Sequence, residues 1–271
     1  MLTRRSISAG LAAAVLGGAG PAVARGRDAA SNPWPDAARA AVSLTYDDGL
    51  NSQLDNAAAA LEAARLKATF FLTLENMDAR LRDWVDLAKA GHEFGNHTVT
   101  HPCDLRAYTP AAFARKEIDP MQAYMDAHFG PNPARLFAYP CSATDLGPGD
   151  ANQQRARYEA LLKAAGFRGA RTCDEDSPNS PGYARAAPYR LRASAATFDK
   201  DDPDLAIAYV EDAMKRGDWA ILVFHDVLPA RAAPGDTSIA THEAILGWIG
   251  SQPIWCAPMG EVLDRIARQP A

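Results

Sequence analysis

Two aspartates, Asp47 and Asp48, stand side by side directly after an apolar stretch and directly before a glycine. A charge at the end of a buried strand is costly unless another group pairs with it, and adjacent carboxylates oppose each other's ionisation. A bound cation resolves both difficulties, because one carboxylate can ligate the metal while the other stays free as a base near the bound water. The alternative is a turn with an Asx hydrogen bond.

Two histidines, His97 and His101, are four residues apart in the segment GNHTVTHP. On a helical turn this spacing puts both imidazoles on one side, where a carboxylate from elsewhere completes a three-ligand site with room for water and substrate. An isolated pair of this kind is more often a solvated surface or a capped turn. His225 ends another apolar stretch and can protonate a leaving group near neutral pH, although a lone histidine there is more often a core residue.

The rest of the chain predicts the fold that brings these residues together. Short β-branched or aromatic segments alternate with Ala-rich amphipathic stretches. The predicted strands are residues 40–46, 68–73, 92–96, 135–139, 167–173, 189–197, 219–225 and 253–258. The predicted helices are residues 53–66, 78–91, 109–130, 154–166, 203–217 and 241–250. Repeated βα units of this length predict an α/β fold with seven or eight parallel strands in a closed or nearly closed barrel.

In such a barrel the active residues lie on the loops that follow the C-terminal ends of the strands. The unusual polar residues of the sequence occupy these positions: Asp47, Asp48, His97, His101, Tyr139, Arg171 and His225. We therefore expect Tyr46 and Tyr139 to line the substrate cleft, beside the metal. We expect His242, at the start of a helix, to lie at the surface.

Composition and charge limit the partners of this chain of 271 residues. A net charge of −5, with no basic cluster in the body of the chain, argues against nucleic acid or an anionic membrane surface as a partner. Residues 1–24 predict an export signal, because Arg4 and Arg5 precede a soft apolar stretch and small residues offer a cleavage site. We expect export to the periplasm or outside of a bacterium, by the twin-arginine or the general secretory route; a short membrane anchor is the alternative.

Three motifs, TYDDG, HTVTH and LVFH, occur in this order and resemble those of the polysaccharide deacetylase family, carbohydrate esterase family four. The similarity runs from about residue 40 to residue 266. It implies an irregular (β/α) barrel and metal-dependent removal of acetyl groups from sugars, commonly with zinc. Position by position, the resemblance implies Asp47 as the catalytic base, Asp48, His97 and His101 as the metal ligands, and His225 as the acid.

The third motif of that family differs in this chain from the family's usual sequence. The family commonly has Arg-Pro-Pro-Tyr-Gly, whereas this sequence has FAYPCS, with Ala138 at the arginine position and Cys141 at the tyrosine position. The family's arginine would normally pair with the base, so we expect Arg171, at the end of the next predicted strand, to supply the positive charge. The backbone N–H of Cys141 can still donate to an oxyanion, because that role needs no particular side chain.

Four cysteines in an exported protein permit up to two disulfides. Cys103, two residues after the second metal histidine, and Cys141 both fall at the predicted rim of the site. A disulfide between them would brace the site; two buried thiols are the alternative.

The domain organisation that follows is a signal at residues 1–24, an extension at 25–39 and a catalytic domain at 40–271. The favoured function is metal-dependent deacetylation of an N-acetylated sugar chain, with one divalent ion, zinc by resemblance, and an acetylated carbohydrate as partner. The same attack by water also serves an O-acetyl esterase or another amide hydrolase. A carbohydrate-binding protein that keeps the fold without catalysis is the third interpretation, which the altered FAYPCS motif favours. The sequence predicts no oligomeric state.

Overall fold

A computed structural model describes residues 32–131, 135–173 and 177–269 of the chain. From Asn32 onward these residues belong to one compact unit. The predicted export signal at residues 1–24 lies outside the described residues. Trp34, in the predicted extension, packs into the core, where its indole N–H donates to the carbonyl of Gly217 at 3.1 Å. None of the helices in the described ranges has the length and apolarity to cross a membrane.

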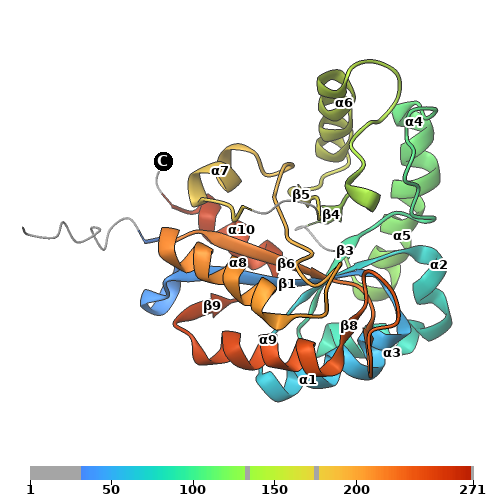
Figure 1. Ribbon diagram of the computed structural model, residues 1–271. Coiled ribbons are helices and arrows are strands. Elements are labelled where there is room, and N and C mark those ends of the chain that lie inside the picture. The colour runs from blue at the N-terminus through green and yellow to red at the C-terminus, as the bar shows by residue number, and fades with distance from the viewer. Residues whose placement is uncertain (1–31, 132–134, 174–176, 270–271) are drawn as a thin grey trace, which may run out of the picture. The chain divides into compact units, whose positions relative to one another are not determined.

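Parallel strands form the central seven-stranded sheet (Figure 1). The sheet order is β5-β4-β3-β2-β1-β6, and β9 pairs with the first residues of β1. These strands are β1 (Ala40–Asp48), β2 (Thr69–Leu72), β3 (Glu93–Asn96), β4 (Leu136–Ala138), β5 (Gly169–Arg171), β6 (Trp219–Phe224) and β9 (Ile254–Cys256). The predicted α/β fold with a parallel sheet is confirmed. Two further short strands, β7 (Val227–Leu228) and β8 (Thr237–Ser238), pair only with each other.

The strand predicted at residues 189–197 is wrong as a regular strand. Leu191 forms an isolated bridge with Arg171 of β5, and Ser194 forms another with Leu222 of β6. The segment therefore changes partner within three residues, and its Ala-rich second half lacks the branched side chains that favour continuous pairing. Because it bonds to both edge strands of the sheet, this segment links β5 to β6 and completes an irregular barrel.

Helices cover the sheet (Figure 1). They are α1 (Ala58–Ala64), α2 (Leu74–Met77), α3 (Leu81–Lys89), α4 (Pro110–Phe113), α5 (Asp119–Phe129), α6 (Ala151–Ala164), α7 (Pro181–Ala186), α8 (Pro203–Arg216), α9 (Ile239–Ser251) and α10 (Met259–Ala267). Thr109 caps α4 by accepting the N–H of Ala112 at 3.2 Å, and Gly217 ends α8 with a φ of 75°. Helices α2, α7 and α10 are not among the predicted helices; α7 lies in a stretch whose proline and glycine favour a loop.

The alternation of side chains along the strands decides which residues reach the site. Successive side chains of a strand point to opposite faces, so a strand that presents Asp47 to the site turns Tyr46 toward the helices. Tyr46 is fully buried, and Tyr139, only 1% exposed, packs with Phe137 and donates its hydroxyl to the carbonyl of Tyr189 at 3.0 Å. The expectation that Tyr46 and Tyr139 line the substrate cleft is therefore wrong.

His242 is also misplaced by the sequence prediction, because it is fully buried rather than at the surface. Its Nε2 lies 2.6 Å from the hydroxyl of Tyr46, and its ring packs on Phe224. The first turn of α9 thus faces the sheet. Burial lowers the pKa of His242 to about 4, so the imidazole is neutral and its Nε2 accepts a hydrogen bond from the Tyr46 hydroxyl.

We expect the free energy of unfolding to fall as pH drops from about 6.5 to about 4. Burial, with the nearby Lys67 charge as a smaller cause, also lowers the pKa of His92 to about 4. Both histidines have a pKa near 6.5 when unfolded, so the unfolded chain binds more protons in this window and stability is complete only above it. Denaturant unfolding between pH 7.5 and 4.5 should show a loss of roughly 2–5 kcal/mol. His242→Gln should flatten this dependence, whereas His128→Gln, at an exposed histidine, should not; equal unfolding free energies at pH 7 and 5 would contradict the prediction.

Candidate functional site

The turn after β1 fixes the two adjacent aspartates. Asp48 has a φ of 77° and Gly49 a φ of 72°, a left-handed conformation that aspartate tolerates and glycine favours. A Cβ at Gly49 would lie 3.2 Å from a methyl of Leu72. The carbonyl of Asp48 accepts hydrogen bonds from the Thr73 hydroxyl at 2.8 Å and the Asn76 amide at 3.0 Å. The chain therefore leaves the strand sharply while both carboxylates stay at its end.

Three side chains meet at a spacing that suits a divalent metal ion. Oδ1 of Asp48 lies 3.5 Å from Nε2 of His97 and 3.5 Å from Nε2 of His101. Bonds of 2.0–2.1 Å to a tetrahedral zinc ion place two ligand atoms about 3.3 Å apart. Two imidazoles and a carboxylate are also a donor set that zinc and related divalent ions accept. The residues that the sequence suggested as metal ligands thus fit such an ion.

His97 is held in the orientation that a metal ligand needs. Its Nδ1 donates to the backbone carbonyl of Ala138 at 2.9 Å, which leaves the lone pair of Nε2 facing Asp48. Burial lowers the pKa of His97, so the ring is neutral near pH 7. Ala138 lacks the arginine side chain of the family motif, yet its carbonyl fixes this imidazole.

The loop between the two histidines is strained and depends on one buried carboxylate. Thr98 and His101 have φ values of 75° and 53°, which cost free energy for residues other than glycine. Glu117, 3% exposed, accepts the N–H and the hydroxyl of Thr100, each at 3.0 Å. Thr98 accepts the N–H of His101 at 3.0 Å. Glu117 therefore holds the loop that presents His101.

Glu117 is a functional residue that the sequence reasoning missed. It follows Phe113 and precedes Met121 at intervals of four residues, so it falls on the buried face of the segment from α4 to α5. An acidic residue on an apolar helical face was the signal that could have revealed it, since a buried carboxylate needs hydrogen-bond donors.

Glu117→Ala should weaken metal binding by roughly 10–100-fold, because outer partners of metal ligands set ligand orientation. Glu117→Gln keeps the shape and one acceptor oxygen, so its effect should be smaller. Titration of the metal-free protein with zinc measures both variants, and Arg115→Ala, at an exposed residue of the same turn, is the matched control. Unchanged zinc affinity in a folded Glu117→Ala variant would show that the loop needs no such support.

Asp47 forms the buried ion pair with Arg171 that the missing motif arginine led us to expect. Asp47 is 2% exposed and Arg171 is fully buried. Nη1 of Arg171 donates to Oδ2 of Asp47 at 2.9 Å, and Nη2 donates to Oδ1. The guanidinium also stacks over the ring of Phe71, 4.6 Å from its centre. Burial alone would raise the pKa of Asp47, but the charge and the hydrogen bonds of Arg171 outweigh it, and that pKa falls to about 2.

His225 emerges beside Asp47 from the neighbouring strand. Tyr46 of β1 is in register with Phe224 of β6, so the next residue of each strand, Asp47 and His225, reaches the same end of the sheet. One side-chain amide, that of Gln53, donates to the carbonyls of both, at 2.5 Å to Asp47 and 3.2 Å to His225. His225 is half-buried. A buried carboxylate and a partly exposed imidazole therefore lie side by side at one end of the barrel.

A disulfide joins the loops that follow β3 and β4. It links Cys103 to Cys141, whose Cα atoms are 5.4 Å apart. Cys141 and Ser142 have φ values of 51° and 54°, so the FAYPCS loop turns sharply at this point. The disulfide between Cys103 and Cys141 that the sequence analysis considered is therefore present.

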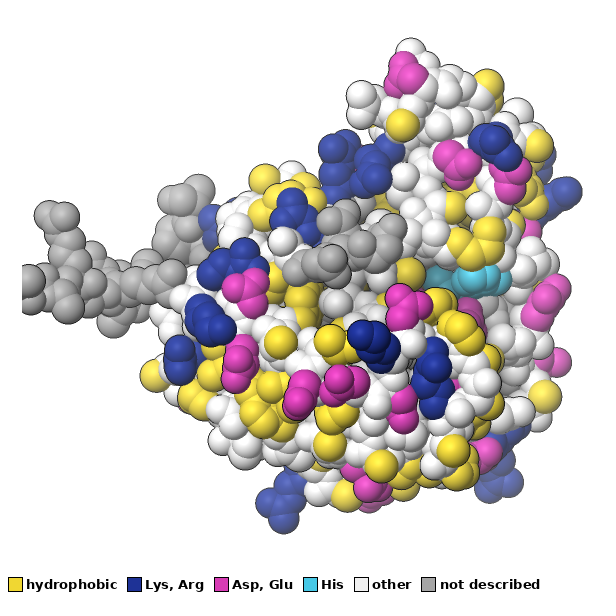
Figure 2. Space-filling model, in the orientation of Figure 1, with side chains coloured by type: hydrophobic (Ala, Val, Ile, Leu, Met, Phe, Trp, Pro, Cys, Tyr) yellow, Lys and Arg dark blue, Asp and Glu magenta, His cyan; other side chains and the backbone are white. Residues whose placement is uncertain are grey.

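The site has a closed side and an open side. Asp47, His97 and Arg171 are buried, whereas the side chains of Asp48 and His101 are 22% and 33% exposed. In the space-filling view, histidine side chains come to the surface in a recess with acidic side chains beside them (Figure 2). A ligand can therefore approach the three candidate metal ligands from the side of Asp48 and His101.

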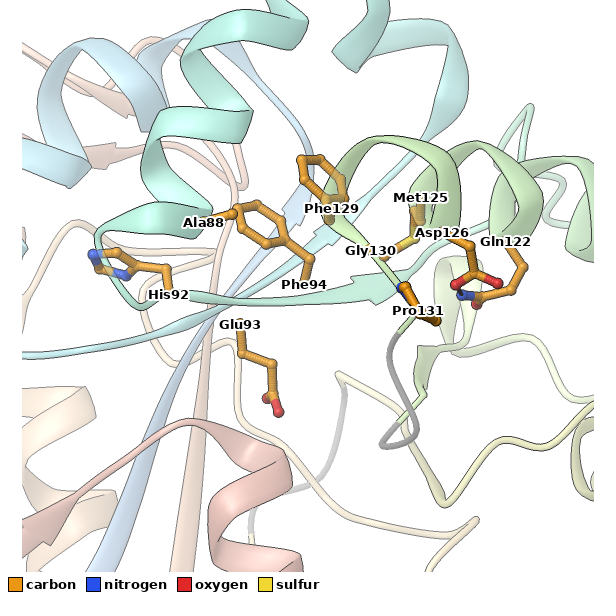
Figure 3. A pocket seen from close by; sticks show the side chains of 10 residues that line it. All are labelled: Ala88, His92, Glu93, Phe94, Gln122, Met125, Asp126, Phe129, Gly130 and Pro131. Atoms are coloured by element: carbon orange, nitrogen blue, oxygen red, sulfur yellow. Dashed lines mark hydrogen bonds between the residues drawn. The ribbon is translucent and has the colours of Figure 1, made fainter.

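A second hollow lies at the other end of β3 and is not part of this site. It has a volume of about 270 Å³, and His92 and Glu93 project from the start of the strand there (Figure 3). Glu93 accepts hydrogen bonds from the Thr69 hydroxyl at 2.7 Å and from the N–H of Gly260 at 3.0 Å. Because Gly260 lies in the first turn of α10, Glu93 caps that helix and has a structural role.

Comparison with known proteins gives one family match. The model described as Polysaccharide deacetylase matches residues 35–160, a range that contains Asp47, Asp48, His97 and His101 and stops before Arg171 and His225. Among curated proteins, none matches the chain.

Solved structures share the fold. A putative polysaccharide deacetylase from Mycobacterium smegmatis is 17% identical, with a TM-score of 0.66, covering 87% of this chain and 93% of that chain. A peptidoglycan deacetylase from Bacillus subtilis is 18% identical, with a TM-score of 0.55 and coverage of 85% and 92%. A CE4 family pseudoenzyme from Bacillus anthracis is 17% identical, with a TM-score of 0.55 and coverage of 83% and 66%. The family match over residues 35–160 and the shared fold confirm the resemblance to the polysaccharide deacetylase family that the motifs predict.

Proposed function

We propose that the protein is a metal-dependent hydrolase that removes acetyl groups from N-acetylated sugars of a polysaccharide or oligosaccharide. One observation carries this proposal: the Asp48 carboxylate lies at ligand spacing from two imidazoles, with a second, buried carboxylate beside it. The family match supports the deacetylase chemistry. A simple buried ion pair would need no imidazoles of His97 and His101 at ligand spacing from the neighbouring carboxylate.

Asp48, His97 and His101 would hold one divalent ion, with zinc favoured by the donor set and by the family resemblance. Such an ion, when bound, would supply Lewis acidity for the acetyl carbonyl and lower the pKa of water. Asp48 lies on the open side of the three ligands, so the acetyl group approaches from there. The closed side, with Ala138 behind His97, excludes bulk water from the ligands.

Asp47 and His225 carry the two proton transfers. Asp47 accepts the proton of the attacking water, and Arg171 keeps it ionised and oriented toward the reacting atoms. The backbone N–H of Cys141 donates to the developing oxyanion. His225 protonates the departing nitrogen of the sugar. Adjacent aspartates are needed because ligation and proton transfer are separate tasks.

Two other functions use the same site. An ester bond is open to the same attack by water, which makes an O-acetyl esterase or another amide hydrolase the nearest alternative. A carbohydrate-binding protein without catalysis is the other, and the bonding of both Asp47 oxygens to Arg171 favours it, because a carboxylate with a pKa near 2 is a weak base.

Acetate release by the zinc-loaded protein from chitooligosaccharides, peptidoglycan fragments and acetylated xylan separates these functions. We expect release from an N-acetylated substrate. Release from acetylated xylan alone would indicate an esterase. No release from any substrate, with zinc bound and sugar affinity retained, would support the binding protein and overturn the hydrolase.

The place of action follows from the same proposal. Export to the periplasm or medium of a bacterium, expected from residues 1–24, would bring the enzyme to acetylated polymers of the cell surface. The Cys103–Cys141 disulfide agrees with this location, since disulfides persist in oxidising compartments.

A further inference from the structure

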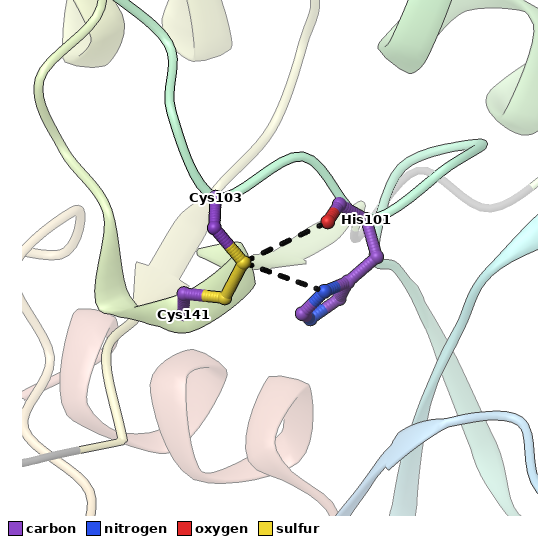
Figure 4. A group of neighbouring side chains, drawn as sticks. All are labelled: His101, Cys103 and Cys141. Carbon is purple, nitrogen blue, oxygen red and sulfur yellow. Dashed lines mark hydrogen bonds between the residues drawn. A yellow bond between two sulfur atoms is a disulfide. The ribbon is translucent and has the colours of Figure 1, made fainter.

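His101 stands between two groups of metal-binding atoms. Its Nε2 lies 3.5 Å from Oδ1 of Asp48, and its Nδ1 lies 3.9 Å from Sγ of Cys103. The imidazole lies beside the Cys103–Cys141 disulfide, whose sulfur atoms turn toward it (Figure 4). Ligand atoms of His101, Cys103 and Cys141 all lie within 4.8 Å of one another, as do those of Asp48, His97 and His101. The imidazole of His101 thus belongs to two neighbouring sets of three potential metal ligands.

The oxidation state of the two cysteines decides which set can bind an ion. Thiolates ligate metals, and they are soft ligands that zinc binds well alongside histidine. The sulfur atoms of a disulfide carry no such charge. Both cysteines are exposed, so a reductant in solution can reach the bond.

We propose that reduction of the Cys103–Cys141 disulfide creates a second metal site, made of both thiolates and Nδ1 of His101, which draws the ion away from Asp48 and His97. This regulation rests on the proposed function of the Asp48 site. A neutral imidazole has one lone pair, so His101 binds an ion through one nitrogen at a time. When Nδ1 takes the ion, Nε2 carries the proton and faces Asp48 as a donor. The two sites therefore compete for one ion.

The reaction balances with a dithiol as reductant. The disulfide takes two electrons and two protons from the dithiol, which itself becomes a disulfide, and the S–S bond breaks to two thiols. Binding of the ion then releases the two thiol protons to solvent. Oxidation by the reverse exchange closes the Cys103–Cys141 bond and returns the ion to Asp48, His97 and His101.

Cobalt(II) is the probe for this site, because thiolate ligation gives a charge-transfer absorption that imidazole and carboxylate ligands do not. The protein is reduced with a water-soluble phosphine, which becomes the phosphine oxide by taking oxygen from water, and excess phosphine is removed before cobalt is added. We expect no thiolate band in the oxidised protein, a band after reduction, and one ion per chain in both states. Reduced Cys103→Ser should lack the band, and reduced Cys173→Ser, at a cysteine outside the disulfide, should keep it.

Circular dichroism and thermal unfolding establish that each variant is folded before its spectrum is compared. A cobalt-loaded, reduced protein without the band would overturn the proposal, as would a band that persists in Cys103→Ser or a second ion bound per chain. None of these readouts uses an acetylated substrate. Failure of the oxidised, zinc-loaded protein to release acetate would instead overturn the hydrolase and leave the cobalt result intact.

Discussion

Asp47→Asn should lower acetate release by roughly 10²–10⁴-fold, the size expected for loss of a general base, while zinc affinity changes little. The reason is that, in the proposed mechanism, Asp47 accepts the water proton, whereas Asp48, His97 and His101 hold the ion. Initial rates of acetate release at saturating zinc, beside a zinc titration of the same sample, measure the two effects separately.

Folding needs its own control, because asparagine at this position leaves the buried charge of Arg171 without a partner. The double variant Asp47→Asn, Arg171→Gln restores a neutral pair of similar size. It should be folded and equally inactive. A folded Asp47→Asn protein that keeps more than about a tenth of the wild-type rate would remove Asp47 from the role of base.

Arg171→Gln should destabilise the protein by about 3–5 kcal/mol, because it leaves the Asp47 carboxylate buried and unpaired. Denaturant unfolding at pH 7 measures this loss. The double variant with Asp47→Asn should be less destabilised than the sum of the two single variants, since the pair is removed together. Additive losses would show that the two side chains do not stabilise each other.

The pH dependence of the same pair has a definite sign. The pKa of Asp47 lies below its ordinary value of 3.8, at about 2, so the contribution of the ion pair is present above pH 4 and is lost as pH falls toward 2. Arg171→Gln should raise the pKa of Asp47 and remove this contribution. The variant should therefore show a weaker dependence of stability on pH between 4 and 2 than the wild-type protein.

The placement of the site could be predicted because parallel strands bring their carboxyl ends to one edge. Asp47 and Asp48 end strand β1, and His97 and His101 follow strand β3, so two motifs suffice to bring these side chains together. Arg171 could be inferred because Ala138 stands at the arginine position of the family motif, so that the Asp47 carboxylate needs a cation from another strand.

The predictions that failed are those that depend on which face of a helix or strand a side chain occupies. Tyr46 and Tyr139 adjoin the site in the sequence but point to the helices, as the alternation along a strand requires. His242 lies on the inner face of α9, where a hydrogen bond to Tyr46 satisfies it. Glu117 is distant in the sequence from the loop that it holds, and only packing in three dimensions brings it to Thr100.

Metal add-back tests the central claim most directly. The protein is stripped of metal by a chelator, and acetate release from an N-acetylated oligosaccharide is followed as zinc is returned, with His97→Ala treated in parallel. We expect release to be lost on stripping, to rise in proportion to bound zinc up to one ion per chain, and to stay absent in His97→Ala. Release that is independent of zinc, or that His97→Ala recovers as fully as the wild-type protein, would contradict a catalytic ion held by Asp48, His97 and His101.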